Sequence, residues 1–188
     1  MLIKRLFTKI KLAPIRRSVK DSKLICADIN RWCSFYKIDD SDPCVVLIAS
    51  YKEFVNLLEY RLLKDGKRFS AFYVRHAFKK LDTLYLCSDE IGPGFLIQHG
   101  FSTIVAAKKI GANCHVAQQV TIGFKNGGNP VFGDDCEVHC GAKCFGEIQI
   151  GSGTIIGANA VVDKSIPPNC VVVGIPGRII KQNGARCD

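Results

Sequence analysis

The stretch 110–123, IGANCHVAQQVTIG, carries an apolar residue at every sixth position: Ile110, Val116 and Ile122. Glycine follows the first and the last of them. A period of six fits neither an α-helix nor a strand of ordinary length. It is typical of a solenoid in which each short strand points one apolar residue inward and a small residue lets the chain turn the corner. The stretch therefore predicts a parallel β-helix.

The same period runs through most of the second half of the chain. The predicted inward positions are Ile91, Ile97, Ile104, Ile110, Val116, Ile122, Phe132, Val138, Cys144, Ile150, Ile156 and Val162. The period is interrupted twice, by one extra residue within QHGFST (98–103) and by four within GFKNGGNP (123–130). A solenoid places insertions on its outside, often on a binding face. The interruptions therefore mark the candidate functional surface, and His99 lies in the first of them.

The first half of the chain has helical spacing instead. Helices are predicted over 24–36 and 68–81, and one between them begins near Pro43 and ends at Asp65-Gly66. We therefore predict a mainly β protein with two parts. Residues 1–83 form a basic arm and a small α-helical region, and residues 84–188 form the β-helix with a C-terminal cap.

The net charge of +9 is concentrated at the start of the chain. Residues 1–20 hold seven lysines and arginines and no acidic residue. We interpret this segment as a solvated, partly frayed arm. Weak contact with an anionic membrane surface is the alternative. No nucleic-acid partner is expected, because no aromatic residues or recognition motif accompany the charge.

Other features of the composition bear on location and metal binding. No apolar run reaches the roughly 20 residues that span a bilayer, and the N-terminus does not match a secretory signal, so we expect a cytoplasmic protein. Its ten cysteines are then expected to be free thiols. Cys136, Cys140 and Cys144 recur beside His139, which could suggest zinc, but no C-x-x-C pair is present. We expect no metal.

Five stretches carry a family resemblance: IGPGFLIQHGFSTIV (91–105), IGANCHVAQQVTIG (110–123), FGDDCEVHCGAKCFGEIQIG (132–151), IGSGTIIGANAVVDKSIPPN (150–169) and VVVGIPGRIIK (171–181). Together they resemble the hexapeptide-repeat acyltransferases, and most of all the serine acetyltransferase branch with its short relatives from capsule and exopolysaccharide gene clusters. The resemblance implies a left-handed β-helix, a homotrimer, active sites between subunits and acetyl-CoA as co-substrate.

The resemblance also implies roles for single residues. The catalytic base would be His99, because a neutral imidazole can accept the proton of an attacking hydroxyl near neutral pH. Its orienting partner is expected at Asp89, chosen over Asp82 and Glu90. The acetyl-CoA contacts implied by the family pattern are Cys140, Ala142, Gly157, Ala158, Lys164 and Arg178. For Lys164 and Arg178, a solvated cap on the final coil is the alternative.

The acceptor pocket departs from the family pattern. Serine acetyltransferases commonly have Asp before the base and an Arg-His pair before the loop proline, where this chain has Gln98 and Gly128-Asn129. Without those charges, capture of an amino-acid zwitterion is weakened. We therefore expect O-acetylation of a saccharide hydroxyl, with Gln98 and Asn129 contacting the acceptor. Serine O-acetylation is the alternative, and a non-catalytic trimeric scaffold is a lesser one.

Overall fold

The protein is described here from a computed structural model covering residues 2–187. Met1 and Asp188, the outer ends of the two predicted parts, lie outside the described residues. The chain forms two compact units that divide after Asp82, a helical unit and a β-helix. In the part of the chain that the structure describes, no helix is both long and apolar enough to cross a bilayer.

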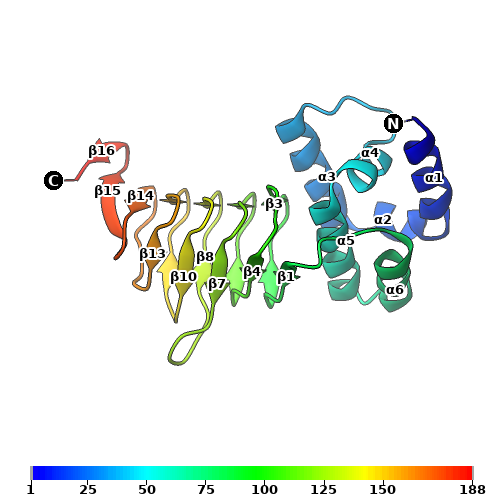
Figure 1. Ribbon diagram of the computed structural model, residues 1–188. Helices are drawn as coiled ribbons and strands as arrows, with labels where there is room; N and C mark the ends of the chain where they lie inside the picture. Colours follow the sequence, from blue (N-terminus) through cyan, green and yellow to red (C-terminus); the bar gives the residue numbers. More distant parts are fainter. Residues whose placement is uncertain (1, 188) are drawn as a thin grey trace. The chain divides into compact units, whose positions relative to one another are not determined.

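The helical unit contains six α-helices and a short 3-10 turn (Figure 1). They are α1 (Leu2–Leu12), the turn Ala13–Ile15, α2 (Arg16–Lys20), α3 (Lys23–Tyr36), α4 (Pro43–Ser50), α5 (Lys52–Lys64) and α6 (Arg68–Ala77). The prediction of a frayed arm was wrong for the described part of residues 1–20. This segment is helical, because Leu12, Ile15 and Val19 supply apolar side chains that are buried in the unit.

The predicted helix between Pro43 and Asp65 is two helices in the structure. Tyr51 has extended backbone, with φ −122° and ψ 107°, and separates α4 from α5. The start at Pro43 and the end at Asp65-Gly66 are confirmed, with Gly66 at φ 71°. The helix predicted over 68–81 ends earlier, at Ala77, where Phe78 turns extended.

The core of the helical unit is built around Trp32 and Phe54, whose rings meet edge to face at 5.1 Å between centroids. One ion pair is buried beside these apolar residues. Arg61 donates two hydrogen bonds to Asp28, at 2.8 Å from Nε and 3.1 Å from Nη2. Both side chains are almost fully buried.

The second unit is the parallel β-helix that the period of six predicts, and it is left-handed, as the family resemblance implies. Its coils stack along one axis (Figure 1) and build three sheets. The first sheet contains β1 (Leu84–Leu86), β4 (Thr103–Val105), β7 (Thr121–Gly123), β10 (Lys143–Phe145) and β13 (Val161–Val162). The second contains β2 (Glu90–Ile91), β5 (Lys109–Ile110), β8 (Val131–Phe132) and β11 (Gln149–Ile150).

The third sheet contains β3 (Leu96–Ile97), β6 (His115–Val116), β9 (Glu137–Val138), β12 (Ile155–Ile156) and β14 (Cys170–Val173). It continues into an antiparallel cap made of β15 (Arg178–Gln182) and β16 (Ala185–Arg186). The remaining pairings between coils are parallel, and most strands contribute one buried side chain each to the core. The cap therefore covers the last coil with hairpin strands of a different direction.

The predicted inward positions form the solenoid core with one correction. Eleven of the twelve are buried, but Ile104 is 42% exposed and Val105 is buried in its place. The pairing of Leu86 with Val105 and of Val105 with Ile122 confirms that Val105 is the inward residue. The first interruption therefore holds two extra residues between inward positions, where the sequence reading counted one.

The second interruption is an outward loop between β7 and β8, seen at the edge of the solenoid in Figure 1. Lys125 and Gly128 are bridged by backbone hydrogen bonds of 3.2 and 3.5 Å. Asn126 and Gly127, at φ 43° and 118°, form the turn between them. An Asn-Gly pair suits such a tight hairpin, because both positions need positive φ. The loop is therefore folded as a small hairpin.

Candidate functional site

His99 lies at the corner where the chain passes from the third sheet to the first. It follows β3 and has left-handed backbone with φ 64°, and Gly100 and Ser102 share that conformation at 54° and 52°. The N–H of Gly100 donates to the carbonyl of Gln98 at 2.8 Å and closes the turn. The side chain of His99 is exposed. The two extra residues therefore push an imidazole outward at this corner.

Strand register shows which residues of later coils occupy the same corner. Ile97, Val116, Val138 and Ile156 are paired in series along the third sheet. Two residues further along each coil come His99, Gln118, Cys140 and Ala158, which we call the His99 edge. Backbone hydrogen bonds connect neighbouring turns of this edge, including Gly141 N–H to Gln118 at 3.0 Å and Asn159 N–H to Cys140 at 2.9 Å.

Four of the predicted acetyl-CoA contacts belong to this edge or end at it. Cys140 is half-buried, Gly157 is half-buried and Ala158 is exposed. Arg178 pairs with Val173 at the start of the cap, directly after the edge has run through the last coil, and it is exposed. Small side chains at 140, 157 and 158 leave the backbone of the edge open to an elongated ligand.

Two other predicted contacts lie elsewhere. Ala142 is fully buried with its methyl group in the core. Its N–H donates to the carbonyl of His139 at 3.2 Å, and its carbonyl accepts from Thr121 N–H at 3.0 Å. Lys164 follows β13 and lies at the corner between the first and second sheets. Neither side chain therefore faces the His99 edge.

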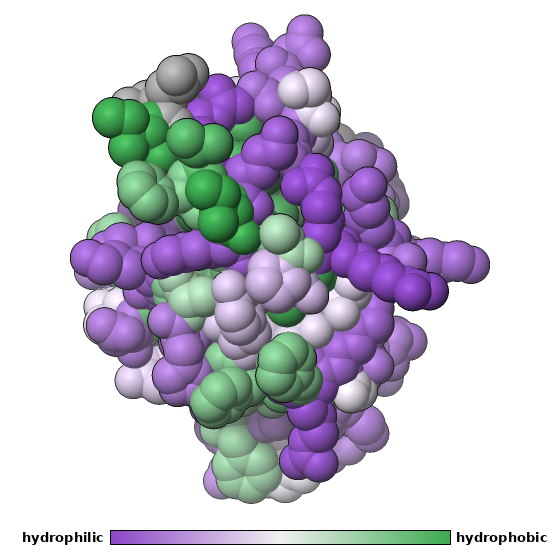
Figure 2. Space-filling view, turned by 90° about the vertical axis from the view of Figure 1, so that its right-hand side faces the viewer, coloured by the Kyte–Doolittle hydropathy of each residue, from purple (hydrophilic) through white to green (hydrophobic). Residues whose placement is uncertain are grey.

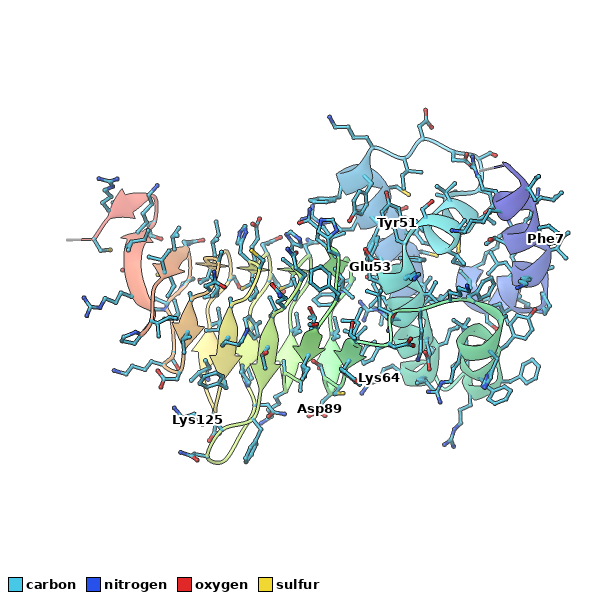
Figure 3. All side chains as sticks on the ribbon, in the orientation of Figure 1. Phe7, Tyr51, Glu53, Lys64, Asp89 and Lys125 are labelled. Atoms are coloured by element: carbon cyan, nitrogen blue, oxygen red, sulfur yellow. The ribbon has the colours of Figure 1, made fainter. Side chains whose placement is uncertain are left out.

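Asp89 also lies at the corner between the first and second sheets, between β1 and β2. Its N–H donates to the carbonyl of Ala107 at 3.2 Å, and its side chain is exposed (Figure 3). His99 and Asp89 thus occupy different corners of the first coil. The structure does not bring them together at one corner of a single chain.

The two predicted acceptor residues are also separated. Gln98 is half-buried directly before His99. Asn129 lies at the end of the hairpin loop, at the corner between the first and second sheets. At the base of the same loop, Lys125 reaches Asp163 at 2.9 Å and lowers the pKa of that carboxyl group through a hydrogen bond.

The sequence reading missed a group of apolar side chains close to His99 along the chain. Phe101 is 45% exposed, and Ile104 and Tyr85 are paired neighbours on the outer side of the first sheet at 42% and 54%. The sequence signal for this apolar group was Ile104. This residue fits the apolar period, but strand register shows that it is not the inward residue of its strand.

The sequence also did not predict a role for Lys143. Its ammonium group donates to the carbonyls of Gln119 and Gly141 at 2.8 and 2.9 Å. Both carbonyls belong to turns of the His99 edge. Lys143 therefore stabilises the turns that follow Gln118 and Cys140, because it binds carbonyl oxygens from two coils at once.

The cysteines and the histidine that could suggest zinc do not form a ligand set in the part of the chain that the structure describes. All ten cysteines are free thiols, and Cys136 and Cys144 point into the core. His139 instead lies 3.2 Å from Glu137 on the surface. Among residues 2–187, no group of three or more histidine, cysteine or acidic side chains is arranged to hold a metal ion.

No family model matches the chain. A serine acetyltransferase from Bacillus licheniformis is 32% identical over 162 residues, which cover 78% of this chain and 74% of the relative. The chain belongs to the serine acetyltransferase family. A serine acetyltransferase from Synechococcus elongatus is 41% identical over 103 residues, covering 52% of this chain and 42% of the relative. The chain thus spans less than half of that relative.

Solved structures of the family have the same architecture. A soybean serine acetyltransferase complexed with serine has a TM-score of 0.62 and 27% identity, covering 89% of this chain and 70% of the other. A Brucella abortus serine acetyltransferase in complex with coenzyme A has a TM-score of 0.63 and 24% identity, covering 94% and 73%. The first likeness extends to sequence, whereas the second shows the fold alone.

Proposed function

We propose that this protein is an acetyl-CoA-dependent serine O-acetyltransferase in which His99 is the general base. The observation that carries the proposal is the position of His99, exposed in a left-handed corner at the start of the His99 edge. Family membership supports acyl transfer. The two-residue insertion at this corner distinguishes it from the same corner in later coils, and it presents the imidazole at the surface.

The chemistry requires one base and no covalent enzyme intermediate. His99 takes the proton of the acceptor hydroxyl as its oxygen attacks the carbonyl carbon of the acetyl thioester. The new C–O bond forms, the C–S bond breaks, and the departing thiolate recovers the proton from His99. Backbone N–H groups at the turns are the simplest donors to the transient oxyanion. Atoms and charge then balance over the cycle.

The His99 edge is a suitable place for acetyl-CoA. Its small side chains at Cys140, Gly157 and Ala158 let a pantetheine chain approach the backbone. Arg178 at the far end of the edge would pair with a phosphate of the ligand. We assign these four residues to the donor site. Lys164 and Ala142 stay outside this assignment, because Lys164 lies at another corner of the single chain and both backbone groups of Ala142 are already hydrogen-bonded within the solenoid.

Serine is the acceptor that we favour. The relatives are named serine acetyltransferases, and the soybean structure holds serine. The saccharide expectation rested on the missing charges at Gln98 and Asn129, and the comparisons give it no support. The two residues lie at different corners of the single chain, so a pocket containing both would need a second subunit. A saccharide therefore becomes the second candidate.

A homotrimer would complete this arrangement. His99 and its apolar neighbours Phe101 and Ile104 are exposed in one chain, whereas acyl transfer profits from a water-excluded site. A neighbouring subunit placed against the His99 edge would cover these residues. It would also bring its own corner, with Asp89 and Asn129, toward the base. We therefore propose active sites formed between subunits.

The test is release of CoA from acetyl-CoA, measured with serine and separately with a panel of sugars. Wild type, His99→Ala and the control His76→Ala are compared, since His76 is an exposed histidine of the helical unit. We expect serine-dependent turnover that falls by about 10²- to 10⁴-fold in His99→Ala and stays unchanged in the control. Turnover with a sugar alone would favour the saccharide acceptor. Absence of turnover and of acetyl-CoA binding would indicate a scaffold.

A further inference from the structure

Helix α1 presents its apolar side chains to solvent. Ile3, Leu6, Phe7 and Ile10 are 72%, 59%, 61% and 62% exposed. Their spacing of i, i+3, i+4 and i+7 places them on one side of the helix, as a stripe about 100° wide. A stripe of this kind ordinarily faces the core. We call these four residues the α1 stripe.

The opposite side of α1 holds the helix on the unit. Thr8 and Leu12 are buried at 7% and 1% exposure, and Arg5 forms an ion pair with Asp40. The helix is therefore fixed by its less apolar side, and the α1 stripe points away from the packed helices. In Figure 2, which looks onto this end of the helical unit, apolar side chains gather at the surface rather than being covered.

Basic residues surround the α1 stripe. Lys4 and Lys11 flank it on one side and Lys9 on the other, as their positions in the helix require. Among the described residues, Lys4 and Lys9 form no ion pair with an acidic group. The helical unit as a whole is also positively charged. Residues 1–82 hold eighteen lysines and arginines and nine acidic residues, whereas residues 83–188 hold eight of each. All of the +9 net charge therefore lies in the helical unit.

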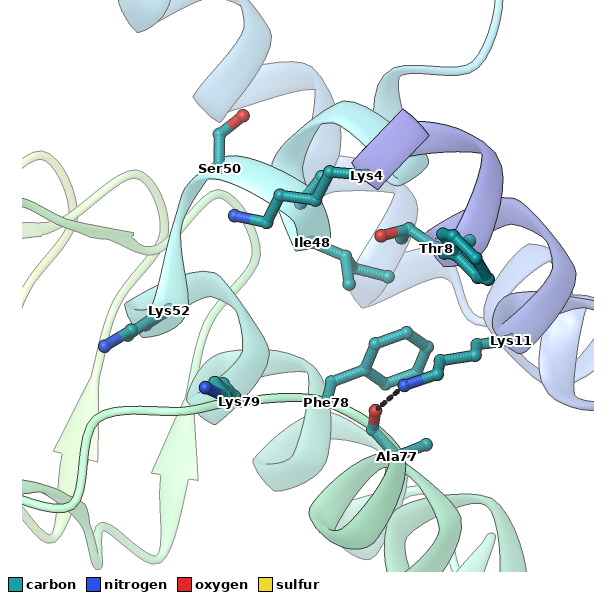
Figure 4. A pocket seen from close by; sticks show the side chains of 11 residues that line it. Lys4, Thr8, Lys11, Ile48, Ser50, Lys52, Ala77, Phe78 and Lys79 are labelled. Atoms are coloured by element: carbon teal, nitrogen blue, oxygen red, sulfur yellow. Dashed lines mark hydrogen bonds between the residues drawn. The ribbon is translucent and has the colours of Figure 1, made fainter. Parts of the chain in front are cut away.

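A hollow beside the α1 stripe adds to this basic surface. It lies between α1, α4 and α6, has a volume of about 260 Å³, and is lined by Lys4, Lys11, Lys52 and Lys79 with no acidic residue (Figure 4). Lys11 donates to the carbonyl of Ala77 at 3.2 Å and keeps one wall in place. Phe78 and Ile48 form part of an apolar floor. The hollow can receive an anionic group next to an apolar surface.

Helix α6 contributes a second exposed apolar group to the same unit. Phe69 and Phe72 are 75% and 62% exposed. The face in Figure 2 shows two apolar areas separated by hydrophilic side chains, and α1 and α6 both lie at this end of the unit in Figure 1. Two apolar contacts with basic residues between them can engage a broad, flat, anionic surface.

We propose that the α1 stripe docks on the surface of an anionic lipid bilayer. Apolar side chains of an interfacial helix enter the boundary between headgroups and acyl chains, while flanking lysines pair with lipid phosphates. The lysine-lined hollow takes one headgroup phosphate. A second copy of this chain is a poorer occupant, because joining two α1 stripes would bring Lys4, Lys9 and Lys11 against the same lysines. The inference is independent of the chemistry at His99.

The test is co-sedimentation of the full chain with two kinds of vesicle, neutral phosphatidylcholine and phosphatidylcholine with 30% phosphatidylglycerol. Wild type is compared with Leu6→Gln/Phe7→Gln, which removes half of the α1 stripe, and with Lys4→Gln/Lys9→Gln. The matched control is Lys108→Gln/Arg186→Gln, which removes the same charge from exposed sites on the β-helix. Circular dichroism and light scattering report folding and oligomeric state for each.

We expect wild type to bind the anionic vesicles at least ten times more tightly than the neutral ones, and to lose binding as salt rises. The stripe variant should lose detectable binding. The lysine variant should weaken it about twenty-five-fold, at about fivefold for each lysine, and the control should stay near wild type. Equal binding to both vesicles, no binding to either, or loss in the control would overturn the proposal. The proposal would also be overturned if the stripe variant changed the oligomeric mass while wild type did not bind vesicles.

Discussion

His99 and Gly100 are consecutive residues that both adopt left-handed backbone, at φ 64° and 54°. In the next coil the chain makes its turn with Gln119 alone in that conformation, at φ 60°. Ser102, at φ 52°, occupies the position of Gln119, so His99 and Gly100 are the two additional left-handed residues of the longer turn. Glycine accepts this backbone freely, and among other residues asparagine tolerates it best. The local conformation and the imidazole can thus be tested separately.

The variant His99→Asn should keep the turn and lose the base. We expect kcat for CoA release to fall by about 10²- to 10⁴-fold, because the proton acceptor is gone. The melting temperature should stay within about 2 °C of wild type, since asparagine suits φ near 60°. Calorimetry together with the kinetic assay measures both. A large loss of stability with retained activity would show that His99 is a structural residue.

Gly157 allows a separation of packing from ligand binding. A Cβ at this position would lie 2.9 Å from Cγ1 of Val173 and 3.1 Å from the carbonyl of Val172. We therefore expect Gly157→Ala to cost about 1–3 kcal/mol and lower the melting temperature by several degrees. Gly123→Ala is the control, because no atom lies within 4 Å of its added Cβ. If Gly157→Ala leaves the melting temperature unchanged and weakens only acetyl-CoA binding, glycine is not needed at this position to avoid a steric clash between coils.

The solenoid could be predicted because each strand of a coil needs an inward apolar residue. Apolar residues therefore recur in the sequence at the six-residue spacing of the strands. The prediction failed at Ile104 for a physical reason. Ile104 and Val105 are both β-branched and apolar, and only the length of the turn at His99 decides which of them points inward. The period of six alone does not show how many residues an irregular corner contains.

The prediction of a frayed arm at the N-terminus is wrong for a related reason. Its seven basic residues suggested solvated chain, yet Leu12, Ile15 and Val19 anchor it at helical spacing. The stronger apolar pattern in the same segment, which includes Leu6 and Phe7, faces solvent. Likewise, the corner that holds Asp89 could not be inferred without register, since proximity along the chain says nothing about which corner a turn occupies.

Asp28 and Arg61 should dominate the electrostatic part of the stability of the helical unit. Removing the carboxylate with Asp28→Ala takes away the negative charge that faces a buried guanidinium, and we expect a loss of about 3–5 kcal/mol in urea unfolding. The double variant Asp28→Leu/Arg61→Met should recover most of that loss, because it removes both charges. Asp21→Ala is the comparison: its pair with Arg17 is exposed, and the midpoint should not move.

The buried thiols of Cys44 and Cys144 should make the folded protein less stable at alkaline pH. Burial raises the pKa of Cys44 and that of Cys144 to about 12 each, above the value near 8.5 of an exposed thiol. The folded state then binds more protons than the unfolded state above pH 9, so the free energy of unfolding falls as pH rises from there toward 12. Urea midpoints at pH 8 and pH 10 measure the fall. Cys144→Ala should flatten it, whereas Cys87→Ala, at an exposed thiol, should not.

Gln98 offers a direct test of the acceptor. It precedes His99 at the candidate site, and the family commonly carries an aspartate there, whose carboxylate can pair with the ammonium group of serine. If serine binds at this corner, Gln98→Asp should raise kcat/KM for serine about two- to tenfold through a charge-assisted hydrogen bond. A neutral sugar has no cation to pair and should gain nothing. Gln118→Asp places the same charge one coil away and serves as the control. A gain with sugars but not with serine would return the saccharide to first place, because the carboxylate would then be accepting hydrogen bonds from hydroxyl groups alone.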